Sequence, residues 1–210
     1  MRPSLICICA FAIALSFWPH ALAQNSEISL GGGYTKLTLE ADLDFINIEE
    51  VTALDGESGA YGEIRFSRSI FIEQLRLGSG VQVAYYTTDG RSEPGLFSIE
   101  DERFLQIAPE LQLSWRQRLG DRLFLEPGVG GGLVAGNYRA RGVTVGGVPQ
   151  EDVDQWEAGL GVRPFLRFGL IVDRFILGLE GSYRWTNIEY EEVDGRLREW
   201  MAGAFISFRF

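Results

Sequence analysis

The chain has 210 residues and a formal net charge of −10, from 19 Lys and Arg against 29 Asp and Glu. Because nucleic-acid binding requires a basic face, this charge argues against a nucleic-acid partner. Hydrophobic residues make up 46% of the chain and aromatic residues 12%. This composition excludes a disordered acidic tail and is sufficient for one packed domain or a small pair.

The first 23 residues have the features of a secretory signal peptide. Arg2 precedes an apolar stretch over residues 5–18, and Ala21-Leu22-Ala23 supplies the small residues of a cleavage site. The apolar stretch is shorter than the roughly 20 residues that a membrane-spanning helix needs. We therefore predict cleavage after Ala23, with residues 1–23 as the signal peptide and residues 24–210 as one mature domain.

Cleavage would remove both Cys residues and the only His, His20, from the mature chain. Disulfides could then not stabilise the fold, and Ser-His, Cys-His and His-metal sites are excluded. Arg2 is the only charge lost, so the mature chain carries a net charge of −11. We expect no enzyme, no cofactor and no resident metal ion.

The mature chain repeats segments of roughly a dozen residues in which apolar side chains alternate with small or polar ones. In residues 104–116, for example, Leu111 and Leu113 alternate with Glu110 and Gln112. This period of two is typical of strands with two unlike faces. No segment after the signal peptide approaches 18 consecutive apolar residues, so we expect no transmembrane helix. In chain order the eight predicted strands are 28–40, 59–69, 75–88, 104–116, 123–138, 155–168, 175–186 and 199–210.

The connections between these strands alternate long and short along the chain. This rhythm is typical of an antiparallel up-and-down barrel with extended loops at one rim and tight turns at the other. Because the number of strands is even, both termini of the mature chain are expected at the short-turn rim. The first strand changes the parity of its apolar residues between Tyr34 and Leu37, which indicates a β-bulge. The seven connections are residues 41–58, 70–74, 89–103, 117–122, 139–154, 170–174 and 187–198.

Polar residues at mid-strand positions indicate which face of the barrel is inside. They combine charges of both signs with many glycines, and Lys36 is the only lysine, whereas a soluble exterior would carry many. Buried charges must be paired, and side chains can fill an eight-stranded barrel. We interpret these residues as a polar plug, with a narrow gated ion channel as the alternative. The predicted lumen network is Glu63, Arg65, Glu110, Glu126, Glu157, Arg163, Glu180 and Arg184.

A Gly-rich run occupies residues 128–132 of the fifth predicted strand. It lacks the complete G-x-G-x-x-G spacing of a nucleotide-binding loop, and a strand pattern continues after it where a helix would be needed. The run therefore indicates a place where strands pack closely or bend.

Aromatic residues gather near the ends of the predicted strands, in two groups at opposite rims. Membrane barrels place aromatic belts at both water interfaces. Two belts favour a lipid-facing exterior, and a soluble periplasmic barrel that binds a lipophilic ligand is the alternative. The group near the long connections is Tyr85, Tyr138, Trp156, Tyr183, Trp185 and Trp200; the group near the short turns is Phe66, Phe71, Trp115, Phe168, Phe175, Phe208 and Phe210.

The last predicted strand ends at Phe210 and carries apolar residues at every second position, including Trp200, Ile206 and Phe208. Here the sequence resembles the outer-membrane β-barrel family, whose last strand typically ends in Phe. By size and strand number it resembles the small eight-stranded OmpA and OmpX type, over essentially the whole mature chain. The resemblance implies an all-β, eight-stranded antiparallel transmembrane barrel in the cell outer membrane, surrounded by outer-membrane lipid. It also implies that these four residues form an assembly signal read by the barrel-insertion machinery.

Negative charge is concentrated in the four long connections, whose formal charges are −6, −3, −1 and −2 in chain order. The simplest interpretation of these charges is a rim that is merely well solvated. The functional interpretation is a surface that binds divalent cations or cationic partners. Asp42-Leu43-Asp44, Glu100-Asp101-Glu102 and residues 151–154 match no complete calcium-loop pattern. Bridging by Mg²⁺ or Ca²⁺ to anionic lipid headgroups is therefore a hypothesis. We predict a monomeric barrel, with no second domain, in a structural, adhesive or surface-interaction role.

Overall fold

The computed structural model describes residues 26–43, 48–88, 91–93, 97–190 and 193–210. In these ranges no helix is long and apolar enough to cross a membrane. The predicted signal peptide, residues 1–23, lies outside the described residues, so its cleavage stays a prediction.

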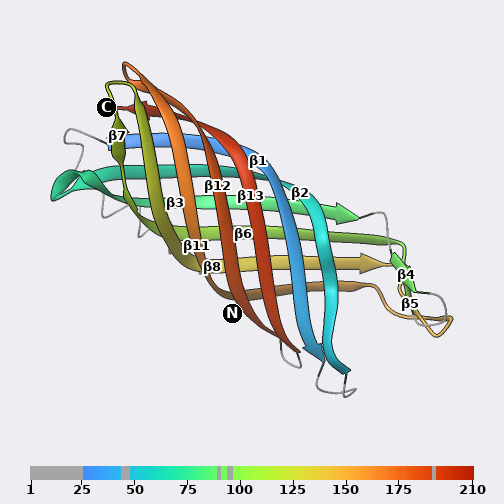
Figure 1. Ribbon diagram of the computed structural model, residues 1–210. Helices are drawn as coiled ribbons and strands as arrows, with labels where there is room; N and C mark the ends of the chain where they lie inside the picture. The colour runs from blue at the N-terminus through green and yellow to red at the C-terminus, as the bar shows by residue number, and fades with distance from the viewer. Residues whose placement is uncertain (1–25, 44–47, 89–90, 94–96, 191–192) are drawn as a thin grey trace.

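Eight long strands pair antiparallel in a closed ring (Figure 1). The ring closes where the last strand pairs with the first, from Glu27 opposite Arg209 onward. Where the ring is complete, closure leaves no free strand edge, so the backbone hydrogen bonds there are satisfied internally. The predicted eight-stranded antiparallel barrel is therefore confirmed. Its strands are β1 (Ser26–Leu43), β2 (Ile48–Ile70), β3 (Ile72–Thr88), β6 (Asp101–Trp115), β8 (Leu123–Arg141), β11 (Val153–Val172), β12 (Phe175–Tyr190) and β13 (Val193–Arg209).

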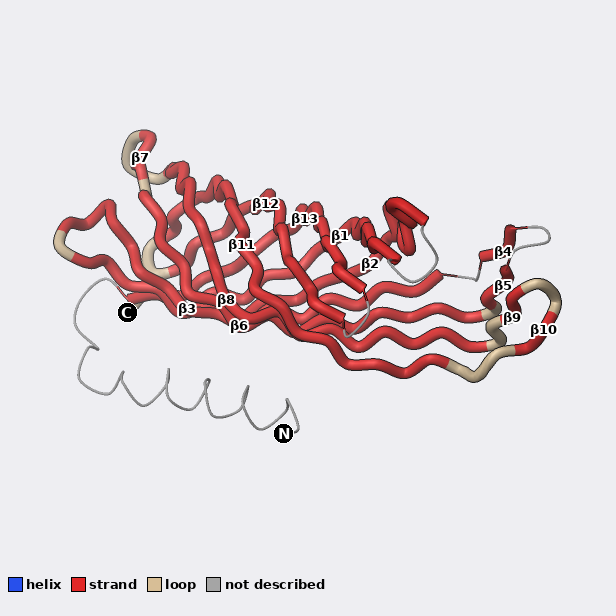
Figure 2. The backbone as a smooth tube through the Cα atoms, turned by 90° about the horizontal axis from the view of Figure 1, so that it is seen from below, coloured by secondary structure: helices blue, strands red, loops and turns tan. Residues whose placement is uncertain are grey.

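Short strands occupy parts of the predicted connections. At the short-turn end, β7 (Gln117–Leu119) pairs with the start of β8. At the other end, four short strands form a separate small sheet beyond the barrel wall (Figures 1 and 2). The long connections 89–103 and 139–154 are therefore partly folded against each other. The small sheet consists of β4 (Arg91–Glu93), β5 (Phe97–Ile99), β9 (Thr144–Val145) and β10 (Val148–Pro149).

The long strands extend past their predicted ends at the long-connection rim, and the wall divides there into two halves. The pairing of β2 with β3 ends at Gly59 with Tyr86, and that of β11 with β12 ends at Gly159 with Ile188. Beyond these pairs, β12, β13, β1 and β2 continue as one half, and β3, β6, β8 and β11 continue as the other (Figure 2). The sequence did not predict these extensions. Apolar and polar residues alternate only where the two faces of a strand lie in different surroundings.

Side chains alternate between the lumen and the outer surface, with the apolar ones outside. Leu111, Val162 and Leu179 are 63%, 51% and 63% exposed, whereas Glu110 and Arg163 are 7% and 0% exposed. Lipid-embedded barrels have this polarity. A soluble barrel with an apolar core would have the reverse.

The predicted bulge between Tyr34 and Leu37 is wrong in its position. Tyr34 faces outward and Leu37 faces inward, so the alternation of the backbone is unbroken between them. The register against β2 shifts only afterwards, between Leu37 and Thr38. The apolar parity changes earlier in the sequence because the lumen itself becomes apolar at this level.

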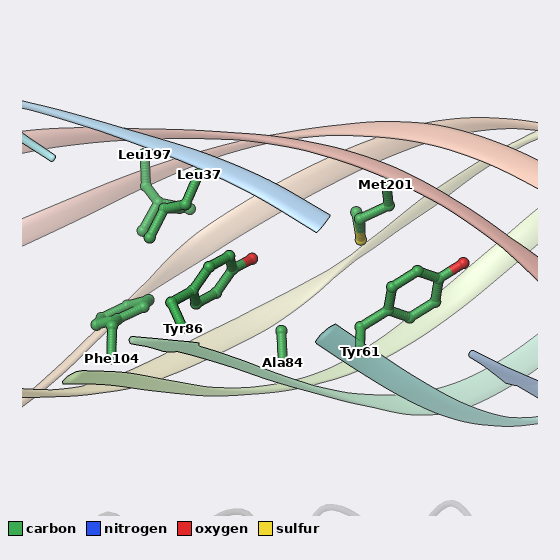
Figure 3. Close-up of a cluster of buried hydrophobic side chains, with 7 residues drawn as sticks. All are labelled: Leu37, Tyr61, Ala84, Tyr86, Phe104, Leu197 and Met201. Atoms are coloured by element: carbon green, nitrogen blue, oxygen red, sulfur yellow. The ribbon is translucent and has the colours of Figure 1, made fainter. Parts of the chain in front are cut away.

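Two apolar clusters lie inside the barrel. Nearer the short turns, Phe124, Ile176 and Phe205 form one cluster. The second, which we call the outer cluster, lies toward the long connections, where side chains from both halves of the wall meet (Figure 3). The outer cluster therefore fills the lumen where the wall begins to divide. It comprises Leu37, Tyr61, Ala84, Tyr86, Phe104, Leu197 and Met201.

Candidate functional site: the luminal ion pairs

Arg163 of β11 lies at the centre of the lumen and pairs with carboxylates from three other strands. Its Nε is 3.1 Å from Glu110 Oε2 on β6. Its Nη1 is 2.8 Å from Glu180 Oε1 on β12, and its Nη2 is 3.2 Å from Glu63 Oε2 on β2. A buried guanidinium needs such partners because water cannot solvate it there. The pairs with Glu110 and Glu63 connect strands that are not neighbours in the sheet.

Glu180 receives two further arginines. Arg65 Nη2 lies 3.2 Å from its Oε2, and Arg167 Nε lies 2.6 Å from the same atom. Arg65 also donates to Glu63, with Nε 2.6 Å from Oε1. The Arg65 guanidinium lies 4.8 Å from the ring centroid of Phe165, a cation–π distance. Cations and anions therefore alternate through this central group.

Arg184 of β12 links the central group to the outer cluster. Its Nη1 is 3.0 Å from Glu199 Oε2, and its Nη2 is 3.5 Å from Glu110 Oε2. It also donates to Gln82, and Tyr86 donates to Glu199. Because Tyr86 belongs to the outer cluster, the ion pairs and the apolar cluster are contiguous.

A second group of ion pairs lies toward the short turns. Glu27 of β1 receives Arg116 and Arg76, with Nη1–Oε2 and Nη2–Oε2 distances of 2.8 and 3.2 Å. Arg116 also pairs with Glu126, with Nε 2.5 Å from Oε2, and Ser114 donates to Glu126 at 2.7 Å. All these side chains are buried. Ion pairs thus cross the lumen at two levels.

The predicted network residues occupy three places in the structure. Glu63, Arg65, Glu110, Arg163, Glu180 and Arg184 lie in the central group, Glu126 lies in the short-turn group, and Glu157 is partly exposed on β11 toward the long connections. The sequence analysis missed five luminal partners, because it selected only residues near the middle of each strand. These partners occupy the same alternate, inward-facing positions closer to the strand ends, and following the alternation to the ends would have found them. They are Glu27, Arg76, Arg116, Arg167 and Glu199.

Outward aromatic residues lie at both ends of the wall. On β12, Phe175 and Trp185 are exposed on the outer face, and Leu179 lies between them. At a rise of about 3.3 Å per residue and a tilt of about 40°, the stretch from Phe175 to Trp185 spans about 25 Å along the barrel axis. This is the height of the apolar band of a membrane barrel. Trp185 and Trp200 both contact Tyr183, with ring centroids 4.4 and 4.3 Å apart.

Tyr138 is the exception among the predicted belt residues. Its hydroxyl donates to Glu102 at 2.5 Å, and its ring packs against the outer cluster inside the barrel. Tyr138 shares the parity of Glu126 on β8, which faces the lumen. The strand's parity, and not the residue type, sets its direction.

The predicted assembly-signal residues share the outer face of the last strand. Trp200, Ile206 and Phe208 of β13 and the terminal Phe210 are all exposed. The Phe208 ring lies 5.5 Å from that of Phe175 and 6.3 Å from that of Phe210. Recognition of these residues by an insertion machinery stays a prediction from the resemblance.

The acidic connections show no metal centre in the part that is described. Among the described residues, no group of three or more acidic, Cys or His side chains could hold a metal ion. Most side chains of residues 41–58 lie outside the described set. Beyond the outer belt, Asp154 pairs with Arg139 at 3.0 Å, and hydrogen bonds from Asn137 and Arg139 lower the pKa of its carboxyl. Some of the negative charge at this rim is therefore neutralised locally.

No protein-family model matches the sequence, and no curated protein matches it either. Solved structures are similar in fold. Ail, the attachment invasion locus protein of Yersinia pestis, has a TM-score of 0.50 at 16% identity, over 88% of this chain and 99% of that one. Its complex with the heparin analogue sucrose octasulfate has a TM-score of 0.51 at the same identity and coverage. The outer membrane protease OmpT from Escherichia coli has a TM-score of 0.54 at 10% identity, over 91% of this chain and 99% of that one.

These similarities establish the class of fold. The closed eight-stranded ring, with its apolar exterior and charged lumen, is the fold of the outer-membrane β-barrel proteins. At 10 to 16% identity the comparison reaches no further than the fold.

Proposed function

We propose that this chain is an integral outer-membrane barrel whose filled lumen makes it a rigid support for an acidic surface. One observation carries the proposal: Leu179 faces outward while its neighbour Glu180 is buried among arginines. Lipid requires an apolar wall whose backbone bonds are satisfied internally. The alternative, a soluble barrel holding a lipophilic ligand, requires an apolar lumen and a hydrated wall.

The membrane part of this proposal is tested by gel mobility and by extraction. A closed hydrogen-bonded wall should resist SDS until heated, so unboiled and boiled samples should migrate differently. The chain should also stay with membranes in high-pH carbonate. Release by carbonate without detergent would favour the soluble barrel.

The orientation follows from the two rims. Membrane barrels of this kind have short periplasmic turns and longer extracellular loops. The long connections, with formal charges of −6, −3, −1 and −2, then form the cell surface together with the small sheet of β4, β5, β9 and β10. This arrangement supports a structural, adhesive or surface-interaction role.

The sign of the charge indicates the kind of partner. Ail has been solved with the polyanion sucrose octasulfate, but an acidic surface repels polyanions and attracts cations. We expect the barrel in lipid nanodiscs to bind immobilised polylysine in a salt-sensitive way and to ignore heparin. Binding to heparin alone would contradict this part of the proposal.

Divalent cations are a further partner proposed for this surface. Mg²⁺ or Ca²⁺ would bridge its carboxylates to anionic lipid headgroups. Adding a chelator to the barrel in anionic bilayers should then increase loop mobility, measured by NMR relaxation. Unchanged mobility would count against such bridging.

In this proposal the luminal ion pairs act as a plug. Arg163 is buried in the central group. Tyr86 and Phe104 are buried in the outer cluster, which lies closer to the long connections. Ions could pass only if these side chains moved. We expect single-channel recordings to show no steady conductance, and stable openings would favour the gated-channel alternative.

We propose no enzymatic role. OmpT is named a protease, but residues 24–210 of this chain contain neither His nor Cys. The buried carboxylates of the lumen are held by arginines, which suits structural pairing better than acid–base chemistry.

A further inference from the structure

The short-turn end of the lumen contains a pocket with a strongly basic lining. Four arginines contribute to it, Arg76, Arg116, Arg118 and Arg209, against one carboxylate, that of Glu73. The cavity measures about 110 Å³. This is room for several water molecules, and hence for one tetrahedral oxyanion.

The pocket has a buried floor and an open rim. Arg76 and Arg116 form the floor, and each is more than nine-tenths buried. Gln74, Gln117 and Arg118 are exposed at the rim. A ligand can therefore enter from the short-turn side of the barrel, opposite the acidic surface.

The two floor arginines differ in how fully they are hydrogen-bonded. Arg116 donates to Glu27 through both terminal nitrogens and to Glu126 through Nε. Arg76 donates to Glu27 and to nearby serines through its terminal nitrogens, but its buried Nε has no partner among the described residues. A buried donor without an acceptor is unfavourable. Arg76 is therefore the less fully hydrogen-bonded of the two floor arginines.

The charges of the pocket do not cancel. Glu27 and Glu126 are the partners of the floor arginines, and Glu73 lies at the rim. Against these three carboxylates stand the four arginines, and in the described part of the chain no ion pair involves Arg118 or Arg209. Among these seven side chains, one positive charge is therefore left over.

We propose that this pocket binds the phosphate group of a ligand that reaches it from the short-turn side. Guanidinium groups bind phosphate oxygens through paired, charge-assisted hydrogen bonds. Arg76 and Arg116 supply the charged floor, and Arg118 and Arg209 supply the cations that no described carboxylate pairs with. Inorganic phosphate and the headgroup of a phospholipid both present this chemistry. The site is separate from the acidic surface and adds a second function to the barrel.

The test is a titration of the folded barrel in nonionic detergent with inorganic phosphate, followed by the Nε–H signals of arginine in NMR spectra. We expect saturable shifts. We expect the double variant Arg118→Gln, Arg209→Gln to raise the apparent Kd for phosphate at least tenfold. The control pair is Arg122→Gln with Arg174→Gln, which removes the same charge from exposed short turns outside the pocket. The control should keep the wild-type Kd.

A parallel titration with glycerophosphoglycerol, the headgroup of phosphatidylglycerol, distinguishes the sources. Tighter binding of this compound supports a lipid headgroup, and tighter binding of phosphate supports the free ion. No saturable shift with either compound, or equal weakening by the control pair, would overturn the proposal. If the double variant shows no heat-modifiable band, Arg118→Gln alone at the exposed rim should weaken binding several-fold. The same gel shows whether the wild-type barrel is folded. A folded barrel that does not bind phosphate would refute the proposed site and leave the proposed membrane barrel standing.

Discussion

Glu110 of β6 and Arg163 of β11 pair across β8, the strand that lies between them. Arg163 Nε is 3.1 Å from Glu110 Oε2. A Cβ at Gly130 of β8 would lie 3.0 Å from the same carboxylate oxygen, tighter than nearly all such contacts. The Gly-rich run 128–132 thus leaves space for luminal side chains to cross over the strand, in agreement with close packing and not with nucleotide binding.

We expect Gly130→Val to lower the free energy of unfolding by about 1–3 kcal/mol, because the branched side chain would displace Glu110 from Arg163. Urea unfolding in lipid vesicles, followed by tryptophan fluorescence, measures this. Gly181→Val is the matched control, since Gly181 faces outward with no atom near its Cβ position; its effect should stay within about 0.5 kcal/mol. Equal losses of unfolding free energy for the two variants would contradict the role of Gly130 in letting Glu110 and Arg163 pair across β8.

Glu180→Gln should be far more destabilising than an exposed substitution. Glu180 is shared by Arg65, Arg163 and Arg167, and its neutralisation leaves buried cations insufficiently paired. Breaking a buried pair costs about 3–5 kcal/mol. Glu151→Gln, at an exposed site, is the control in the same urea assay. A loss below about 1 kcal/mol for Glu180→Gln would be incompatible with a structural plug.

Leu179→Arg tests the lipid-facing wall. A charge at the bilayer midplane costs about 2–4 kcal/mol, and one near the interface costs about 0–1 kcal/mol. Leu179 lies near the middle of the stretch from Phe175 to Trp185, so we expect the larger loss there and the smaller one for Trp185→Arg. Both are measured as unfolding free energies in bilayers. Similar small losses at the two positions would indicate that this face meets water.

Phe210→Ala tests the proposed assembly signal separately from stability. Phe210 is exposed, and its ring contacts are Phe66 at 6.4 Å and Phe208 at 6.3 Å. We expect several-fold less heat-modifiable barrel in cell membranes, with an unchanged refolding yield in detergent. Phe71→Ala, in an exposed short turn, should change neither quantity. Equal loss in cells for both variants would argue against a specific signal.

The sequence by itself determined the class of fold and which face meets lipid. Strict alternation such as that around Leu111 and Val162 is a local property of an extended chain, because successive side chains point to opposite sides. The sequence analysis misplaced Tyr138 and Leu37, because it assigned them to the outer face by residue type and not by their place in the alternation. Following parity alone would have placed both inside.

Only the tertiary structure decided which luminal groups meet. Glu27 contacts Arg116, 89 residues away, and Arg163 reaches over β8 to Glu110. Such pairs depend on closure of the ring and on the stagger of the strands, neither of which a period of two encodes. The pocket of the proposed phosphate site is likewise a tertiary feature, because its lining comes from residues far apart in the sequence, such as Arg76 and Arg209.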